Sequence, residues 1–277
     1  GGPQGLGKTT FVLQVAREAM RRGHPVLYVS YEHDAVTVLE RLLAMEAGES
    51  AGIEAPGLRD LRALLEAAGD TAGLLDRLAR RPGGAEAVVA VQDYADHLEV
   101  YRAGGATDVA AIIGAVASTT QVHGRAPLVI VDYVQKVADR SEHGEDERMV
   151  SVVGSLKDLA LEHVVPVLVV AAADADGIAT GRRMRVQHLR GASALAYEAD
   201  VVLVLNEKYD AVARQHLVYG ASNVERFRAF AVLTIEKNRG GMDKIDMQFR
   251  KRFEQSRFER EGSLVEEQLV DERLYVD

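Results

Sequence analysis

A glycine-rich segment with a lysine and two threonines opens the chain, and its spacing is that of a phosphate-binding loop. It fits the pattern G-x-x-x-x-G-K-[ST] with the residues Gly2, Pro3, Gln4, Gly5, Leu6, Gly7, Lys8 and Thr9, followed by Thr10. Glycines let the backbone curl so that N–H groups surround a polyphosphate, while the lysine reaches the β and γ phosphates and the hydroxyl holds Mg²⁺. An amphipathic helix predicted at about 9–22 adds its positive dipole end to the same place. The segment predicts a nucleoside triphosphate site rather than a simple glycine-rich turn.

Two carboxylates follow short apolar runs. Asp132 ends the run 128–132, and a carboxylate at the end of a central strand is placed to orient Mg²⁺ beside a phosphate loop. Glu32 follows a strand predicted at 24–30, from which it would polarise the water that attacks the γ phosphate. Each also has a plainer interpretation: a strand-end turn for Asp132, and a solvated loop position for Glu32. The phosphate loop favours the metal-binding interpretation of Asp132.

Alternating apolar and amphipathic segments indicate the elements that position these residues. Such alternation is typical of an α/β fold with a mostly parallel, twisted sheet covered by helices on both faces. Strands are predicted at 24–30, 98–101, 128–132, 165–171, 201–205 and 230–236, and helices at 9–22, 35–47, 108–122 and 148–163. Within a single domain over 1–277, we expect a helical insertion at 48–90, an acidic loop at 139–147 and a C-terminal β meander from Lys244. Because a phosphate loop follows a buried strand, we expect that strand to precede Gly1, outside this sequence.

Composition narrows the classes of function. The chain has 277 residues, of which 47% are hydrophobic and 27% charged, and it has no cysteine, which excludes disulfides and argues against structural zinc. The most apolar run, 164–173, is too short to span a membrane and fits a buried strand. We therefore expect a cytoplasmic protein without membrane contact.

A formal net charge of −9 means that nucleic-acid binding would need a local basic patch. One candidate patch consists of Arg182, Arg183, Arg185 and Arg190. A solvated basic face is the alternative interpretation of these arginines.

Several segments carry distinctive sequences. They are Tyr31-Glu32-His33, the run L-V-I-V-D-Y-V-Q at 128–135, the segment 189–200, the run Glu236-Lys237-Asn238-Arg239-Gly240, and the tail 247–259 with its Arg-Phe-Glu. Together with the phosphate loop, they give nearly the whole chain a resemblance to the RecA-type motor domain of the DnaB-family replicative helicases. In that family these segments hold the catalytic glutamate, the metal-binding strand, the helix after a DNA-contacting loop, a Lys-x-Arg element and a final hairpin.

The resemblance implies a RecA-like P-loop fold and a P-loop ATPase that uses ATP and Mg²⁺. Lys8 and Thr9 would bind phosphates and metal, and Glu32 would act as general base on a strand next to that of the phosphate loop. Lys237 and Arg239 would stabilise the transition state in a neighbouring subunit's site; otherwise they are a solvated strand end. A site completed in trans implies a homo-oligomeric ring, by family analogy a hexamer, that acts on single-stranded DNA through the arginine-rich loop.

Two features depart from the family pattern. Ala172 stands where the family carries a glutamine that senses the γ phosphate, and alanine has no amide with which to do so. The acidic residues at 139–147 occupy a region that faces DNA in the family, where carboxylates repel phosphates.

Three hypotheses follow. The resemblance favours an ATP-driven motor of helicase type. The two departures favour a ring-forming nucleotide switch or scaffold that exposes a surface to a protein partner. A recombinase-like or clock-type RecA ATPase fits the Lys-x-Arg element less well.

Overall fold

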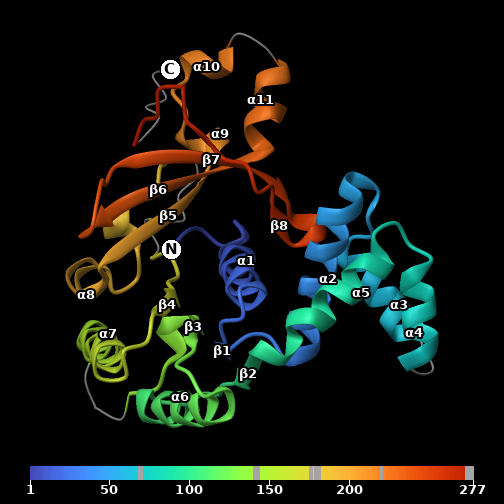
Figure 1. The fold of residues 1–277 in the computed structure, drawn as a ribbon. Helices are drawn as coiled ribbons and strands as arrows, with labels where there is room; N and C mark the ends of the chain where they lie inside the picture. Colours follow the sequence, from blue (N-terminus) through green and yellow to red (C-terminus); the bar gives the residue numbers. More distant parts are fainter. Residues whose placement is uncertain (68–70, 140–143, 175–176, 178–181, 219–220, 272–277) are drawn as a thin grey trace.

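A four-stranded parallel sheet positions the carboxylates (Figure 1). The computed structural model describes residues 1–67, 71–139, 144–174, 177, 182–218 and 221–271. The sheet has the order β2-β1-β3-β4, made of β1 (Val26–Ser30), β2 (Leu98–Arg102), β3 (Leu128–Asp132) and β4 (Val167–Val170). Ser30 and Asp132 are in register, so β1 and β3 end at the same edge of the sheet. The four strands lie where the apolar runs predict them.

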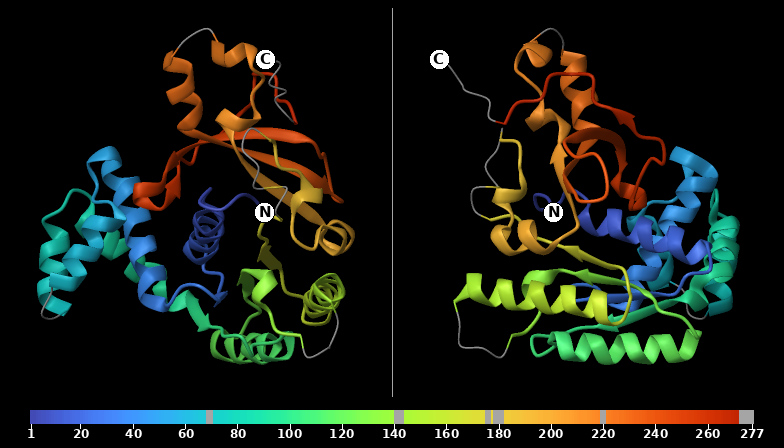
Figure 2. Two further views of the ribbon diagram at one scale, coloured as in Figure 1. Left: turned by 180° about the vertical axis from the view of Figure 1, so that it is seen from behind. Right: turned by 60° about the vertical axis from the view of Figure 1, so that its left-hand side comes forward.

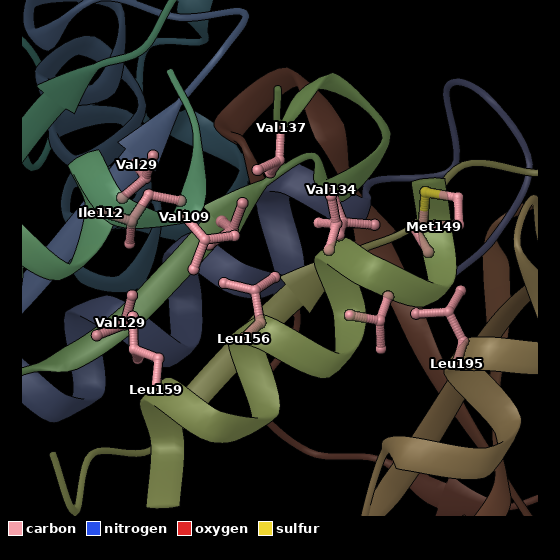
Figure 3. Close-up of a cluster of buried hydrophobic side chains, with 14 of the residues drawn as sticks. Val29, Val109, Ile112, Val129, Val134, Val137, Met149, Leu156, Leu159 and Leu195 are labelled. Carbon is pink, nitrogen blue, oxygen red and sulfur yellow. The ribbon is translucent and has the colours of Figure 1, made fainter. Parts of the chain in front are cut away.

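Helices cover both faces of the parallel sheet. Successive side chains of a strand point to opposite faces, and in these strands the apolar side chains on both faces need to be buried. Val26 and Tyr28 of β1 pack with the helices α1 (Lys8–Arg21), α2 (Ala35–Ala51) and α5 (Gly84–Tyr94). Leu27 and Val29 face α6 (Val109–His123) and α7 (Glu145–Glu162), in the cluster that Figure 3 shows. Burial of one such side chain contributes about 1.5–3 kcal/mol. The two clusters therefore fix the strand ends from both sides.

A second, antiparallel sheet follows in the chain. It consists of β5 (Val201–Glu207), β6 (Phe230–Asn238), β7 (Ile245–Arg252) and β8 (Arg257–Phe258), with β9 (Ser263–Leu264) paired to β7. It begins at β5, earlier than the expected meander. Helix α1 contacts both β3 and β8, and it lies between the two sheets in both views (Figures 1 and 2).

Gly1 and Gly2 lie between the sheets. Gly2 forms a parallel bridge with Ala172, just after β4, while the Leu205 amide of β5 donates to the Gly1 carbonyl at 2.8 Å. A cavity of about 430 Å³, walled mainly by β4, β5 and α7, adjoins Gly1. The phosphate loop therefore begins beside the carboxyl ends of β4 and β5.

Shorter helices complete the described chain. In chain order, α3 (Leu58–Ala67) and α4 (Thr71–Ala79) lie between β1 and β2, and α8 (Ala192–Glu198) precedes β5. The segment from β5 to β6 contains α9 (Lys208–Ala211), α10 (Gln215–Val218) and α11 (Ala221–Arg228). Single 3₁₀ turns occur at Gly52–Glu54, Ala95–His97, Val134–Lys136, Val186–His188 and Phe253–Gln255. Among the described residues, no helix is long and apolar enough to cross a membrane.

Two expectations about these elements are wrong. The strand before Glu32 is not the neighbour of the segment that leads into the phosphate loop, because β3 and β4 separate β1 from Gly2. The acidic stretch 139–147 is not a loop throughout, because α7 begins at Glu145; residues 140–143 lie outside the described chain. Carboxylates in a first helical turn interact favourably with the helix dipole, which explains why an acidic run begins this helix.

Candidate functional site

The phosphate loop has the curled backbone that its glycines predict. Gly5 and Gly7 adopt positive φ angles of 78° and 79°, in the left-handed region that favours glycine, and Gly7 is the N-cap of α1. Because Gly7 has no capping side chain, the first N–H groups of α1 are free to receive an anion. The Lys8 ammonium donates to the carbonyls of Gly2 and Pro3 at 2.8 and 2.7 Å, inside the curl. Burial lowers the pKa of Lys8, and the charges of Asp132 and Glu32 oppose that shift.

Thr9 and Asp132 meet although 123 residues separate them. The Thr9 hydroxyl donates to Asp132 Oδ2 at 2.8 Å, and the Tyr28 hydroxyl donates to the same oxygen at 2.7 Å. Asp132 is 2% exposed and Tyr28 is fully buried. Burial and the neighbouring Asp132 charge raise the pKa of Tyr28 well above its usual range, so the phenol stays protonated and remains a donor. The structure thus joins a hydroxyl and an oriented carboxylate, both oxygen ligands of the kind Mg²⁺ prefers.

Glu32 lies at the same edge of the sheet, in the bend after β1. Its side chain is exposed, and its charge reaches both Lys8 and Tyr28, whose pKa values it raises. Among the described residues, no group of three or more His, Asp or Glu side chains is placed to hold a metal ion. A metal held here would take ligands from Thr9, Asp132 and the bound phosphates.

The C-terminal hairpin, which consists of β7, β8 and the turn Phe253–Gln255 between them, covers the phosphate loop. A Cβ built on Gly7 would lie 2.7 Å from the Phe253 ring, so only glycine fits beneath that ring. Gln14 of α1 exchanges two hydrogen bonds with the backbone of Phe258, at 3.0 and 2.8 Å. From the other side, Arg257 donates to the Gly48 carbonyl of α2 at 2.9 Å. The hairpin is therefore part of the site.

In a single copy of the chain, Lys237 and Arg239 lie away from this site. Lys237 pairs with Val202 at the amino end of β5, whereas the phosphate loop leaves at the carboxyl end. The Lys237 ammonium donates to the Ala196 carbonyl at 2.7 Å, and the half-exposed Arg239 pairs with Asp200 at 3.2 Å. Both cations thus lie around the C-terminus of α8.

The four arginines do not form a common surface, which corrects the expectation of one basic patch. Arg183 is 4% exposed and donates to Thr234 at 3.0 Å and to Asp246, and Arg185 bridges Glu236 and Asp271 at 2.9 and 2.7 Å. Arg182 is half-buried. The exposed Arg190 pairs with Glu145 at 2.9 Å. Arg183 and Arg185 therefore hold the segment to β6, β7 and the tail, and Arg190 is the most exposed cation of the four.

Two buried residues at this edge escape the sequence reasoning. Tyr28 looks like one more apolar strand residue, and only the alternation of the strand, which points it toward α1, hints at its position. Gln135 lies after Asp132 in the Val134–Lys136 turn; its amide oxygen accepts from the Ala172 N–H at 3.1 Å, and its nitrogen donates to the Arg190 carbonyl at 2.9 Å. Its place in the D-Y-V-Q run is the one available signal.

Similar proteins have the same arrangement of elements. One solved structure, an ATPase domain, has a TM-score of 0.70 and 16% identity over 93% of this chain and 81% of that chain. Another, a DnaB-like replicative helicase described with its interactions with primase, has a TM-score of 0.69 and 16% identity over 93% of this chain and 55% of that chain. This chain therefore spans about half the length of the helicase. No curated protein matches the sequence.

Family models cover both halves of the chain. An AAA domain model matches residues 1–173, and the model of the DnaB-like helicase C terminal domain matches residues 89–260. With the structural matches, they show that the expected RecA-like P-loop core is correct. The expected C-terminal β meander is part of an antiparallel sheet that already begins at β5. Because residues 89–260 make up more than half of the sequence, the chain belongs to the DnaB-like helicase C-terminal domain family.

Proposed function

We propose that this chain is the Mg²⁺-dependent, ATP-hydrolysing part of a ring-forming motor that acts on single-stranded DNA. The observation that carries the proposal is the hydrogen bond between Thr9 and Asp132, beside a curled loop with Lys8 at its centre. Family membership supports the helicase class, because the fold of nearly the whole chain matches that of a DnaB-like helicase.

The residues present fit a magnesium nucleotide. The positive φ angles of Gly5 and Gly7 turn the backbone inward, and the uncapped start of α1 offers N–H donors to an anion. Lys8 would exchange its contacts with the Gly2 and Pro3 carbonyls for phosphate oxygens, and Thr9 and Asp132 would hold the metal. When bound, Mg²⁺ supplies charge neutralisation and orientation of the phosphates.

Hydrolysis needs a group that orients water and accepts its proton. Glu32 is exposed at the edge where Asp132 ends its strand, so water has access to its carboxylate. Asp132 is buried and paired with two donors, whereas Glu32 is exposed, and we therefore propose Glu32 as the general base, as the family resemblance implies. Loss of such a base reduces the rate by about 10²–10⁴-fold.

Lys237 and Arg239 support a site shared between copies of the chain. They lie at the opposite strand end from their own phosphate loop, and Arg239 is about half exposed. A second copy stacked head to tail would bring them to its neighbour's site, where two cations stabilise developing negative charge. Repetition of that contact generates a ring when the rotation between copies closes, and by family analogy we propose a ring of six copies.

A nucleotide switch is the second candidate function, and specific observations favour it. Ala172 has no side-chain amide, Arg183 and Arg185 are held in ion pairs, and the exposed Arg190 is paired with Glu145. These three arginines are thus less able to attract a phosphate backbone. In this case ATP binding would assemble the ring for a protein partner, and DNA would have little effect on hydrolysis.

ATP hydrolysis by the full-length protein, measured with and without single-stranded DNA, separates the two functions. We expect stimulation by DNA that weakens steeply with salt, because bound phosphates release counterions. Glu32→Gln should keep nucleotide binding and lose turnover, Lys8→Ala should lose binding, and the surface variant Glu86→Gln should behave as the parent. Hydrolysis that ignores DNA at low salt would favour the switch, and unchanged turnover in Glu32→Gln would refute the assignment of the base.

A further inference from the structure

The Gln135 side chain connects three parts of the chain that are distant in sequence. It is 5% exposed and lies three residues after Asp132. Its amide oxygen accepts from the Ala172 N–H, just after β4, and its nitrogen donates to the carbonyl of Arg190, in the segment 182–190. Both ends of the amide are therefore engaged, each by a backbone group.

Ala172 belongs to the same network through its backbone. Its carbonyl accepts from the Arg190 N–H at 3.0 Å, and its bridge with Gly2 joins it to the phosphate loop. On the far side, the Arg148 guanidinium of α7 donates to the Gln135 carbonyl at 3.1 Å. Gln135 thus belongs to a network of hydrogen bonds that connects the turn after β3, the phosphate loop and the segment 182–190.

We propose that Gln135 is a positioning residue that transmits the state of the nucleotide and metal site to the segment 182–190. The inference rests on the proposed motor function and names the route of its coupling. A movement of Asp132 passes to Gln135 through a single 3₁₀ turn, and from there to Ala172 and Arg190.

Hydrogen-bond geometry makes this route sensitive to small movements. N–H···O hydrogen bonds span about 2.7–3.2 Å, so a shift of roughly half an ångström at Gln135 would take its contacts out of that range. The loss of the partner of the partly buried Ala172 N–H is unfavourable, so we expect the segment 182–190 to rearrange in response. Because the Arg190 backbone belongs to this network, its exposed side chain would move together with the segment.

Two variants test the proposal in the full-length protein. Gln135→Met has a similar volume and removes both hydrogen bonds, whereas Gln135→Glu keeps the acceptor for Ala172 and loses the donor to Arg190. The readout is the affinity for a fluorescent oligothymidine with and without a non-hydrolysable ATP analogue, together with basal and DNA-stimulated hydrolysis. Gln121→Met, an exposed change on α6, is the matched control.

We expect both Gln135 variants to keep basal hydrolysis and nucleotide affinity, but to lose the effect of nucleotide on DNA affinity, a coupling of roughly 5-fold or more in the parent. A merely structural role would weaken DNA binding equally with and without nucleotide, and that result would overturn the proposal, as would full coupling in both variants. A parent protein whose hydrolysis ignores DNA would instead overturn the motor function, and this inference with it.

Amide hydrogen exchange of the unmodified protein gives a check that does not depend on a variant's folding. The amides of Ala172 and Arg190 belong to one network, so nucleotide should change their protection together. A change at Ala172 with none at Arg190 would contradict transmission between them.

Discussion

Removal of the Tyr28 hydroxyl tests whether a buried donor holds the carboxylate of Asp132, which we propose as a metal ligand. In Tyr28→Phe the ring keeps its packing, because Tyr28 is fully buried in the α1 face of the sheet. Asp132 Oδ2 then accepts from Thr9 alone. No cavity opens at the ring, so the measured change reports the hydrogen bond.

The expected magnitude follows from the charge of the acceptor. A hydrogen bond to a charged group contributes about 1.5–3 kcal/mol, against about 0.5–1.5 kcal/mol for a neutral pair. Tyr31 provides the neutral comparison, since its hydroxyl donates to the Thr107 carbonyl at 3.0 Å. Tyr28→Phe should therefore cost about 1 kcal/mol more in free energy of unfolding than Tyr31→Phe. Side chains that hydrogen-bond a metal ligand typically affect metal affinity by about 10–100-fold, so the Mg²⁺ requirement for hydrolysis should rise by that factor.

Urea denaturation followed by circular dichroism, and a Mg²⁺ titration of hydrolysis at saturating ATP, measure the two effects. The slope of the unfolding free energy against urea should stay constant while the midpoint falls, as expected for a change in stability alone. Equal costs in Tyr28→Phe and Tyr31→Phe, with an unchanged Mg²⁺ requirement, would show that the Tyr28 hydroxyl does not support the carboxylate.

Two further perturbations test other parts of the structure. Arg239→Ala and Lys8→Ala should each be inactive in hydrolysis yet regain part of the activity when mixed, since each lacks a different half of a shared site; no recovery in a subunit-exchange assay would argue against a site in trans. Glu46→Gln should cost about 3–5 kcal/mol of unfolding free energy because it leaves the buried Arg17 unpaired, only 2.5 Å away in the parent. Burial tends to raise the pKa of Glu46, but Arg17 and Arg21 outweigh burial and lower that pKa. The ion pair therefore stabilises the fold fully above the pKa of an unfolded glutamate, about 4.3, and this stabilisation is lost as the pH falls through the pKa of Glu46 in the folded protein. Urea titrations at neutral and acid pH should therefore show the deficit of the variant shrinking in acid; a constant deficit would contradict the assigned ion pair.

Elements with a local signal could be predicted from the sequence. The apolar runs at 128–132 and 230–236 form strands, and the hydroxyl of Thr9 does meet Asp132, because the pattern of a phosphate loop and an apolar strand ending in a carboxylate extends over few residues. The fold class follows from the alternation of such elements. These features need no knowledge of which strand lies next to which.

Features that depend on strand order or distant partners could not be predicted. Neither β1 nor Gly2 carries a residue that fixes its neighbours, so the intervening β3 and β4 are seen only in the structure. In the sequence, Arg183 looks like a surface cation. The structure shows that it pairs with Asp246, which is 63 residues away. Gln135 contacts residues 37 and 55 positions away, and no local pattern records those distances.

The hairpin over the phosphate loop sets the time at which the site can form during synthesis. Gln14 and Phe258 are 244 residues apart, so the ribosome needs roughly 12–50 s between them at ordinary elongation rates. Through that interval Leu6 and Gly7 lack the aromatic cover of Phe253 and Phe258. A nascent chain therefore lacks this cover over its phosphate loop until the segment with Phe253 and Phe258 has been made.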